Sequence, residues 1–393
     1  MPNDVLIVHG ARTAMAEYNG AFRDRTEVEL GALAAKAALD RAGVAPAAIE
    51  HVIFGNAQQT SSNAVYGARH VGLKAGVPDH VPALTVNRLC GSGIQSIVSG
   101  AQLIQLGEAD LVLAGGMENM SQAPHVIRGL RVGLRLGEGR LEDSLTTALL
   151  DTHCGLMMAQ TADLLAKEKG ITRREADVFA LRSQQLAQAA HAAGRLREEI
   201  VSVEVKRQGR TAAFDTDDHP RPDSTLEGLA KLAPVFGTEL VTAGNASGIV
   251  DGGAAVVLAS AERARRDGLK CLGRIASWHY EGVDPRRMGL GPVPAIRGAL
   301  KHAGLGLQEI DLFEINEAFA AQYLAVEKEL GLDRERVNVN GGAVALGHPL
   351  GATGTRLVLT LLLEMRRRRA RHGVASACIG GGQGIALLVE SPS

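Results

Sequence analysis

Cysteine is scarce in this chain, as are aromatic residues and any excess of charge. Four cysteines occur among 393 residues, and no two of them form a CxxC pair. They are too few and too scattered for a disulfide framework, and we expect no zinc or other metal site. Cysteines that stay free thiols are typical of a reducing compartment, so we expect a cytoplasmic protein.

The charged residues almost cancel. Lys and Arg number 42 and Asp and Glu number 43, which gives a formal net charge of −1. A balanced chain lacks the overall field that steers proteins to nucleic acids. We therefore expect no nucleic-acid partner, and any anion-binding site must be local.

Long hydrophobic runs are also missing. No apolar stretch is long enough for a membrane-spanning helix, so we expect no membrane partner. Near the N-terminus a short apolar run follows Asp4 directly, which predicts a strand and not a signal peptide.

Small residues take the place of the missing aromatic ones. Aromatic residues make up 3% of the chain, whereas 47 residues are glycine. Small side chains allow helices and sheets to pack closely, which favours a layered α/β fold. A chain of this length is too long to fold around a single hydrophobic core, so we predict roughly two to three domain-sized units.

Two distant parts of the chain resemble each other. A predicted helix at 30–42 ends at Gly43 and is followed by a short strand at 52–54. Residues of this segment recur 261 positions later in one register: Ala38, Leu39, Ala42, Gly43, Ile49 and Ala57 return as Ala299, Leu300, Ala303, Gly304, Ile310 and Ala318. Ser92 and Gly93 match Thr353 and Gly354 at the same offset. This run predicts a duplicated, doubly wound α/β unit.

The region between the two repeats has a different character. It begins with a basic, loop-like stretch and contains a long helix, for which Thr172 and Glu175 predict a capping box and Gly194 the end. We predict an N-terminal half at 1–120 plus about 243–270, an inserted loop domain at 121–242 and a C-terminal half at 271–393. Such insertions commonly carry binding residues.

Three glycine-rich stretches each contain one reactive side chain. They are VNRLCGSGIQS with Cys90, NVNGGAVALGHPLGATGTR with His348, and ACIGGGQGI with Cys378. A thiol nucleophile, an imidazole base and a second thiol suffice for acyl transfer. Glycine lets the backbone approach a thioester and direct its N–H groups at an oxyanion.

Each reactive residue has a local context that predicts its role, and each has an ordinary alternative. Cys90 lies between a predicted strand at 81–86 and a helix, so the helix N-terminus should lower its pKa. Cys90 and Cys378 could equally be small buried hydrophobes, and a single His such as His348 is often a packed core group. The coincidence of all three glycine-rich contexts favours the functional interpretation.

Together with Asn316-Glu317-Ala318-Phe319-Ala320, these motifs resemble the thiolase family over essentially the whole chain. The resemblance implies a five-layer fold of two duplicated α/β halves with an inserted loop domain. It implies ping-pong acyl transfer, in which Cys90 carries the acyl group and His348 takes its proton. Cys378 would move a proton at the α-carbon, and Glu317 would orient neighbouring groups. Coenzyme A would be a substrate, with no cofactor needed, and the enzyme would be a homodimer or homotetramer.

The resemblance also implies the binding residues. Asn316 would hold a water that forms one oxyanion hole with His348, and the backbone N–H groups of Cys90 and Gly380 would form the second. The remaining contacts to CoA and the acyl group would come from Ser247, Arg221, Met158, Met288, Phe319, Ala318 and Phe236.

One departure from the family pattern bears on the substrate. Many short-chain thiolases have His-Met-Gly where this chain has Met157-Met158-Ala159. We expect an acetyl-CoA acetyltransferase that acts on acetoacetyl-CoA, with a broader-chain 3-ketoacyl-CoA thiolase as the alternative. Two other classes share the fold. A decarboxylating ketoacyl synthase would lack Cys378, and a lipid-binding relative would lack Cys90 or His348.

Overall fold

The computed structural model describes residues 4–207 and 209–392. Its strands are β1 (Val5–Thr13), β2 (Ala16–Glu17), β3 (His51–Gly55), β4 (Ala83–Val86), β5 (Leu111–Glu118), β6 (His125–Ile127), β7 (Leu141–Asp143), β8 (Leu150–Asp151), β9 (Leu156–Met157), β10 (Ile200–Val201), β11 (Val203–Arg207), β12 (Arg210–Phe214), β13 (Val250–Ser260), β14 (Gly273–Gly282), β15 (Leu312–Ile315), β16 (His372–Ile379) and β17 (Gln383–Glu390).

The α-helices vary in length from a single turn to five turns. They are α1 (Glu27–Ala42), α2 (Gly67–Lys74), α3 (Ser92–Gln105), α4 (Ser144–Ala148), α5 (Met158–Lys169), α6 (Arg173–Ala192), α7 (Leu226–Ala230), α8 (Ala261–Asp267), α9 (Pro292–Ala303), α10 (Ala320–Leu330), α11 (Ala343–Leu346) and α12 (Leu350–Arg368). The strand expected near the N-terminus is β1; residues 1–3 lie outside the described part of the chain.

The main sheet consists of two similar groups of strands. The N-terminal group has the order β4-β3-β5-β13-β1, and the C-terminal group has the order β15-β16-β17-β14. In both groups parallel strands, three in the N-terminal group and two in the C-terminal group, are followed by antiparallel ones. The groups meet where β1 pairs with β14 over only two residue pairs, Leu6 with Arg274 and Ile7 with Gly273. This arrangement confirms the duplicated α/β fold.

The repeated sequence segment adopts the same local structure in both halves. Helix α1 ends at Gly43 with φ 66°, and α9 ends at Gly304 with φ 69°. Both glycines have the left-handed conformation that a helix C-cap often requires. Each helix is followed by a short 3-10 turn and then by a parallel strand, β3 or β15. The 261-residue offset therefore corresponds to a structural repeat.

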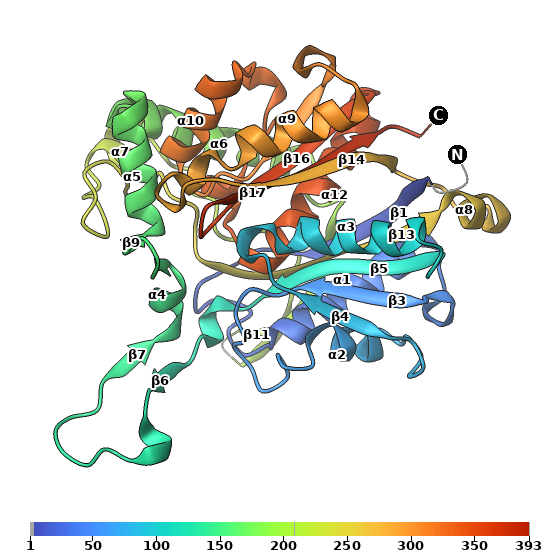
Figure 1. Ribbon diagram of the computed structural model, residues 1–393, viewed down its shortest axis with the longest axis horizontal. Coiled ribbons are helices and arrows are strands. Elements are labelled where there is room, and N and C mark those ends of the chain that lie inside the picture. The colour runs from blue at the N-terminus through green and yellow to red at the C-terminus, as the bar shows by residue number, and fades with distance from the viewer. Residues whose placement is uncertain (1–3, 208, 393) are drawn as a thin grey trace.

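The elements form five layers (Figure 1). Helices α1 and α2 cover the outer face of the N-terminal sheet, and α9 and α10 cover the outer face of the C-terminal sheet. Helices α3 and α12 lie between the two sheets, where their apolar side chains form one core with both. Burial on all sides explains why α12 has a nearly continuous apolar sequence.

The two central helices cross at the glycines of the repeat. A Cβ atom on Gly93 would lie 2.4 Å from the backbone nitrogen of Thr355, and one on Gly354 would lie 2.4 Å from that of Ile94. The hydroxyl of Thr355 also donates to the carbonyl of Gly93 at 3.1 Å. Because only glycine allows this approach, the helix N-termini that carry the reactive residues are held close together.

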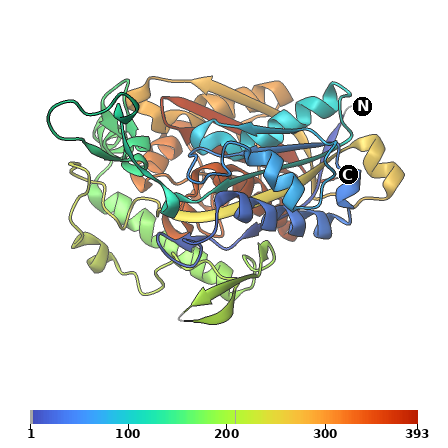
Figure 2. The same ribbon diagram turned by 90° about the horizontal axis from the view of Figure 1, so that it is seen from below.

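The region between the halves forms the side of the molecule at which α5 lies (Figure 1). The predicted capping box is present: Thr172 caps α6 and Glu175 returns the hydrogen bond. The helix ends at Ala192, two residues before Gly194, the predicted stop. Figure 2 shows the two-stranded hairpin of β11 and β12 at the edge of the molecule, and Figure 1 shows the hairpin of β6 and β7 projecting away from it. The domain boundaries given above stay a prediction.

Candidate active site

Cys90 lies in a 3-10 turn, Leu89–Gly91, between β4 and α3. Leu89, which precedes it, has a φ of 46°, an uncommon conformation for a residue with a branched side chain. The hydroxyl of Ser92 accepts the N–H of Arg88 at 2.8 Å and closes the turn. A strained turn before the first helical residue places the thiol at the helix N-terminus, as the sequence predicts.

The predicted lowering of the Cys90 pKa is wrong. Burial raises the pKa of the thiol to about 11, although the backbone N–H groups of Gly380 and of Cys90 itself act in the opposite direction. Desolvation outweighs the two N–H donors because a thiolate loses its hydration in this site. The resting nucleophile is therefore a neutral thiol that needs a base.

His348 lies in the connection between α11 and α12 and is buried. Its Nδ1 is 2.6 Å from the hydroxyl oxygen of Thr353, which is 2.9 Å from the carbonyl oxygen of Pro349. The hydroxyl has one proton, and the carbonyl can only accept it. We therefore assign the imidazole proton to Nδ1, which leaves a lone pair on Nε2.

Nε2, the ring nitrogen of His348 without a proton, faces Asn316. The side-chain nitrogen of Asn316 lies 3.3 Å from Nε2, and its Oδ1 has no hydrogen-bond partner among the described residues. Burial and the nearby guanidinium of Arg356 lower the pKa of His348 to about 3. The imidazole is therefore neutral at physiological pH and can accept a proton at Nε2.

Cys378 is buried near the end of β16. Burial raises the pKa of its thiol, and the neighbouring Cys90 raises it further. Its apolar surroundings are four of the predicted contacts: Met288, Ala318, Met158 and Phe319. A neutral thiol in such a place is a proton donor to a carbanion and not a second nucleophile.

Glu317 supports the loop on which Asn316 lies. Its carboxylate is fully buried and accepts hydrogen bonds from the Ser183 hydroxyl at 2.7 Å, the Asn338 side chain at 2.8 Å and the Val344 N–H at 3.1 Å. These bonds connect the loop to α6 and to the start of α11. The orienting role predicted for Glu317 fits this geometry.

A cavity of about 430 Å³ has His348 in its wall. Cys90 packs with Met120 and Leu350 of the wall, and Cys378 packs with Met158 and Phe319. The wall includes the predicted residues Met158, Phe236, Ser247, Phe319 and His348. The rest of the wall is mostly apolar and comes from both halves and the insertion: Tyr18, Met120, Leu149, Met157, Ala159, Val235, Ala243, Ala246, Ile249 and Leu350, with Glu17, His219 and Gly248 as further members. The size is within the range of small-molecule sites.

Arg221 lies in a neighbouring depression and not in this cavity. Its exposed guanidinium pairs with the carboxylate of Glu17 at 3.0 Å and donates to the carbonyls of His219 and Asp218. Glu17, His219 and Ala243 line both the depression and the cavity, so the Arg221 guanidinium, paired with Glu17, lies next to the cavity.

Two polar residues of the site were not predicted from the sequence. Thr353 fixes the tautomer of His348, and its position in the first turn of the following helix was the available signal. Glu118 is fully buried beside Cys90, and the signal was an acidic residue at the end of the apolar strand β5. Both signals are weak because a Thr or Glu at an element end is common.

Other kinds of site find no support in the described chain. In residues 4–207 and 209–392, no group of His, Cys, Asp or Glu side chains is arranged to hold a metal ion. Over the same residues, no helix is both long and apolar enough to cross a membrane.

Comparison with known proteins gives a consistent result. Residues 5–262 match the family "Thiolase, N-terminal domain", and residues 269–391 match "Thiolase, C-terminal domain". The chain is 51% identical to the mitochondrial 3-ketoacyl-CoA thiolase of Homo sapiens over 98% of each chain, and 50% identical to the acetyl-CoA acetyltransferase of Pseudomonas aeruginosa over 98% of this chain and 99% of that one.

A solved structure agrees with the sequence matches. The crystal structure of human mitochondrial 3-ketoacyl-CoA thiolase in complex with CoA superposes with a TM-score of 0.97 at 51% identity, over 99% of this chain and 98% of that one. With both family domains matched and relatives about half identical over nearly the whole length, this chain belongs to the thiolase family and is an acyltransferase.

Proposed function

We propose that the enzyme catalyses the reversible thiolysis of 3-ketoacyl-CoA, with acetoacetyl-CoA as the first substrate. The observation that supports this most is that a neutral His348 base lines an apolar cavity whose wall residues pack against the neutral Cys90 and Cys378 thiols. The first half-reaction needs all three groups to start in these protonation states.

In the first half-reaction, Nε2 of His348 takes the thiol proton of Cys90 and the sulfur attacks the 3-keto carbon. The bond between carbons 2 and 3 breaks, and its electron pair goes to carbon 2 as the enolate of acetyl-CoA. Cys378 protonates that carbon, and acetyl-CoA leaves. The imidazolium formed on His348, with Asn316 beside it, stabilises the oxyanion.

In the second half-reaction, the thiol of CoA attacks the acyl group on Cys90 and gives its proton to the Cys378 thiolate. The Cys90 sulfur leaves and regains its proton from His348, so both thiols return to their starting state. Claisen condensation of two acetyl-CoA molecules is the same sequence in reverse. This chemistry uses only side chains and CoA, and we propose that no further cofactor takes part; activity should survive EDTA.

We assign CoA to the cavity and the depression beside it. Ser247 on the cavity wall would contact the pantetheine, and Arg221 would meet the adenine or phosphate end. The crystal structure of the human relative in complex with CoA supports a CoA site in this fold. Arg221→Ala should raise KM for CoA more than it lowers kcat.

A broader-chain activity is the second candidate, because the cavity wall is apolar at Met157, Met158 and Leu149. An apolar wall favours added methylene groups, at up to about 0.8 kcal/mol for each one buried. The two candidates separate in a thiolysis series with 3-ketoacyl-CoAs of increasing chain length. Sharp preference for acetoacetyl-CoA supports the first, and equal or rising kcat/KM with length supports the second.

The same series tests the proposal against other classes. A ketoacyl synthase would not form acetyl-CoA from ketoacyl-CoA and CoA, and a binding module would not acquire a labelled acetyl group on Cys90. Absence of thiolysis with every chain length would contradict the proposed function.

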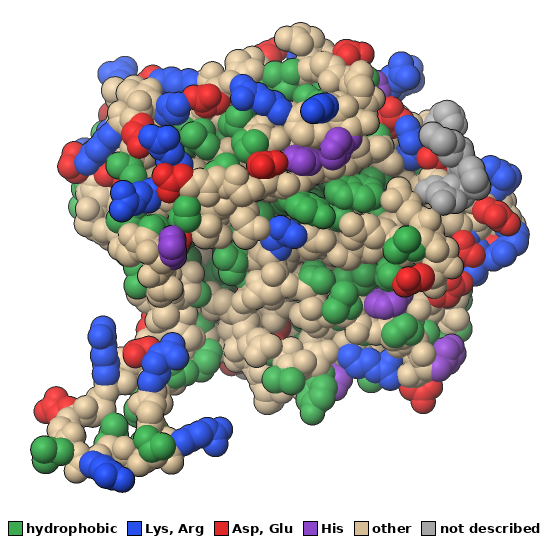
Figure 3. Space-filling view, viewed as in Figure 1, with side chains coloured by type: hydrophobic (Ala, Val, Ile, Leu, Met, Phe, Trp, Pro, Cys, Tyr) green, Lys and Arg blue, Asp and Glu red, His purple; other side chains and the backbone are tan. Residues whose placement is uncertain are grey.

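We propose a homodimer that pairs into a homotetramer. The edge strand β4 has Leu84 about half exposed (48%), a feature that favours pairing with a second copy. The hairpin of β6 and β7 presents apolar and arginine side chains away from the body (Figure 3), with Val132 83% and Leu136 99% exposed. By light scattering, Leu84→Glu should give smaller species, and Leu136→Ser should give dimers.

We propose a cytoplasmic location. All four cysteines are free, and two of them must stay thiols for the reaction, which requires a reducing compartment. Fractionation of the source cells tests this; recovery from an oxidising compartment or an organelle would contradict it.

A further inference from the structure

Glu118 is a buried carboxylate to which the reaction above gives no part. It is the last residue of β5 and is fully buried. Its Oε1 accepts the side-chain N–H of Asn56 at 2.9 Å and the backbone N–H of Gln58 at 3.0 Å. Its Oε2 accepts the backbone N–H groups of Ala57 at 3.0 Å and Gly351 at 2.8 Å.

The contact with Gly351 joins the two halves. Gly351 is in the first turn of α12, three residues after His348, whereas Glu118 belongs to the N-terminal sheet. The approach is close: a Cβ atom on Gly351 would lie 2.5 Å from the carbonyl oxygen of Met117 and 2.8 Å from that of Gly55. The start of α12 is therefore inserted between the ends of β3 and β5.

The chemistry of the contact suits a carboxylate. All four partners are N–H donors, and an ionised carboxylate only accepts. The N-terminus of α12 adds the favourable end of a helix dipole. Burial raises the pKa of Glu118 to about 8, while the N–H groups of Gln58, Ala57 and Gly351 favour the ionised form.

The same carboxylate also holds the surroundings of Cys90. Ala57, which donates to Glu118, packs with Cys90 against one small apolar cluster. That cluster includes Leu350, the residue between Pro349 and Gly351. One side chain thus connects the loop beside the nucleophile with the helix start beside the base.

We propose that Glu118 is a positioning residue that sets His348 against Cys90 across the junction of the two halves. The inference rests on the proposed function, because it assumes that His348 takes the proton of Cys90. A looser junction would change the distance between the Cys90 sulfur and Nε2 of His348. Small misplacements of two reacting groups lower the reaction rate strongly.

Glu118→Gln tests the proposal because it keeps the shape and removes half of the acceptors. Two of the four N–H groups would then face an NH₂ group. We expect the pre-steady-state burst of acetylation by radiolabelled acetyl-CoA to slow about 10-fold or more. The burst amplitude, which counts folded sites, should stay near one per subunit, and KM for CoA should change by less than about twofold.

Glu364→Gln is the matched control. Glu364 lies near the opposite end of the same helix, is buried, and accepts hydrogen bonds from Asn340 at 3.0 Å and Arg368 at 2.6 Å. Its loss should lower Tm without slowing the burst. Should Glu118→Gln fail to fold, Glu118→Asp keeps the charge but shortens the side chain by one methylene, and the same slow burst is expected.

The outcomes are distinguishable. A wild-type burst rate in folded Glu118→Gln overturns the positioning role. A lower amplitude at an unchanged rate also overturns it, since it shows a purely structural residue. No burst in the wild-type enzyme contradicts the proposed function itself, whatever the variants do.

Discussion

In the N-terminal half, β3 and β5 end next to Asn56 and Glu118, whose side chains hydrogen-bond to each other at 2.9 Å. In the C-terminal half, the corresponding β15 and β16 end next to Asn316 and Cys378, and Asn316 instead faces His348. The same strand ends thus carry groups that hold the backbone in place in one copy and the proposed reacting groups in the other. The duplicated scaffold is preserved while its loop residues have diverged.

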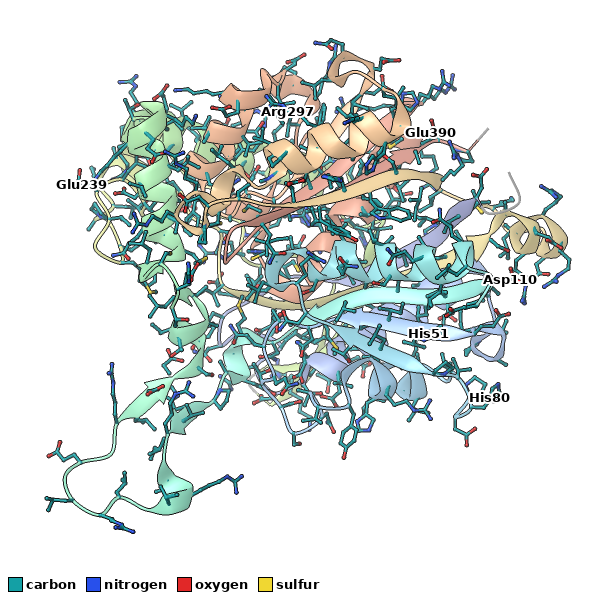
Figure 4. The ribbon with its side chains drawn as sticks, viewed as in Figure 1. His51, His80, Asp110, Glu239, Arg297 and Glu390 are labelled. Carbon is teal, nitrogen blue, oxygen red and sulfur yellow. The ribbon has the colours of Figure 1, made fainter. Side chains whose placement is uncertain are left out.

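The site depends on which ends of the strands the two halves bring together. Figure 4 labels Asp110, the residue before β5, at one end of the sheet. Glu239, also labelled, lies on the opposite side of the molecule, where α5 is. Glu118 ends the same strand on the α5 side, beside the start of α12. In the proposed reaction the N-terminal half supplies the nucleophile and the C-terminal half supplies the proton-transfer groups, so neither half would be a complete site.

Among the variants considered, removal of the Cys90 thiol or of the His348 imidazole should reduce the thiolysis rate most. Cys90→Ala and His348→Ala should each lower thiolysis by about 10⁴-fold, since groups that act as a unit fail together. The assay follows loss of acetoacetyl-CoA. Cys271→Ala, a half-buried cysteine outside the site, is the control and should keep wild-type activity. Comparable activity in Cys90→Ala would show that the N-terminal half does not supply the nucleophile.

Cys378→Ala should separate the two thiols. Thiolysis should fall by about 10²- to 10⁴-fold because the enolate loses its proton donor. Acetylation of Cys90 by acetyl-CoA, measured as a labelled burst, should be slowed less than thiolysis, because that step forms no enolate and loses only the proton donor to the CoA thiolate, a good leaving group. Full thiolysis in this variant would refute the acid role of Cys378.

The protonation state of Cys90 can be tested by alkylation of the free enzyme. With its pKa raised to about 11, the thiolate fraction is small at neutral pH and grows as pH rises. The iodoacetamide rate should increase about tenfold for each pH unit between about pH 8 and pH 10. Mass spectrometry of the Cys90 peptide reports the rate. If the alkylation rate instead reached a plateau near pH 8 to 9, as for a small free thiol, the pKa of Cys90 would not be raised.

Thr353 is the pseudo-symmetric counterpart of Ser92, so its role sharpens the comparison. Thr353→Val removes the partner of Nδ1 and should lower kcat about tenfold and shift the pH profile of kcat/KM, because the imidazole loses its fixed tautomer. Thr353→Ser retains the hydroxyl and should restore most of the rate. Equal activities of the two variants would exclude a role for the hydroxyl.

The insertion should influence specificity more than chemistry. Met157→His introduces the imidazole common in short-chain relatives into the apolar wall. We expect kcat/KM to shift toward acetoacetyl-CoA relative to longer 3-ketoacyl-CoAs by a few-fold, up to about tenfold. The burst rate of acetylation should stay constant. An unchanged chain-length profile would show that Met157 only packs.

The sequence was most informative where local pattern determines local structure. The glycine caps at Gly43 and Gly304, the capping box at Thr172 and the strand before Cys378 depend on neighbours within a few residues. The 261-residue repeat predicted that the two α/β halves share one fold, because matching residues in one register indicate the same pattern of helices and strands. The identities of Cys90, His348 and Cys378 followed from their glycine-rich motifs.

What the sequence could not give depends on distance and solvent. The pKa of Cys90 was predicted in the wrong direction, because the helix terminus is visible in the sequence but the desolvation is not. The crossing of α3 and α12, the proton on Nδ1 of His348 and the contact of Glu118 with Gly351 join residues that are far apart in the chain or depend on its packing.

The sequence by itself therefore determined the two α/β halves and pointed to the candidate reactive side chains, since helices, strands and motif residues are encoded locally. The tertiary structure alone decided how the halves face each other, which groups are buried, and which protonation states follow. Hydrogen bonds and desolvation act through space, and only the folded chain packs Cys90 of the N-terminal half against Leu350, two residues after His348 of the C-terminal half.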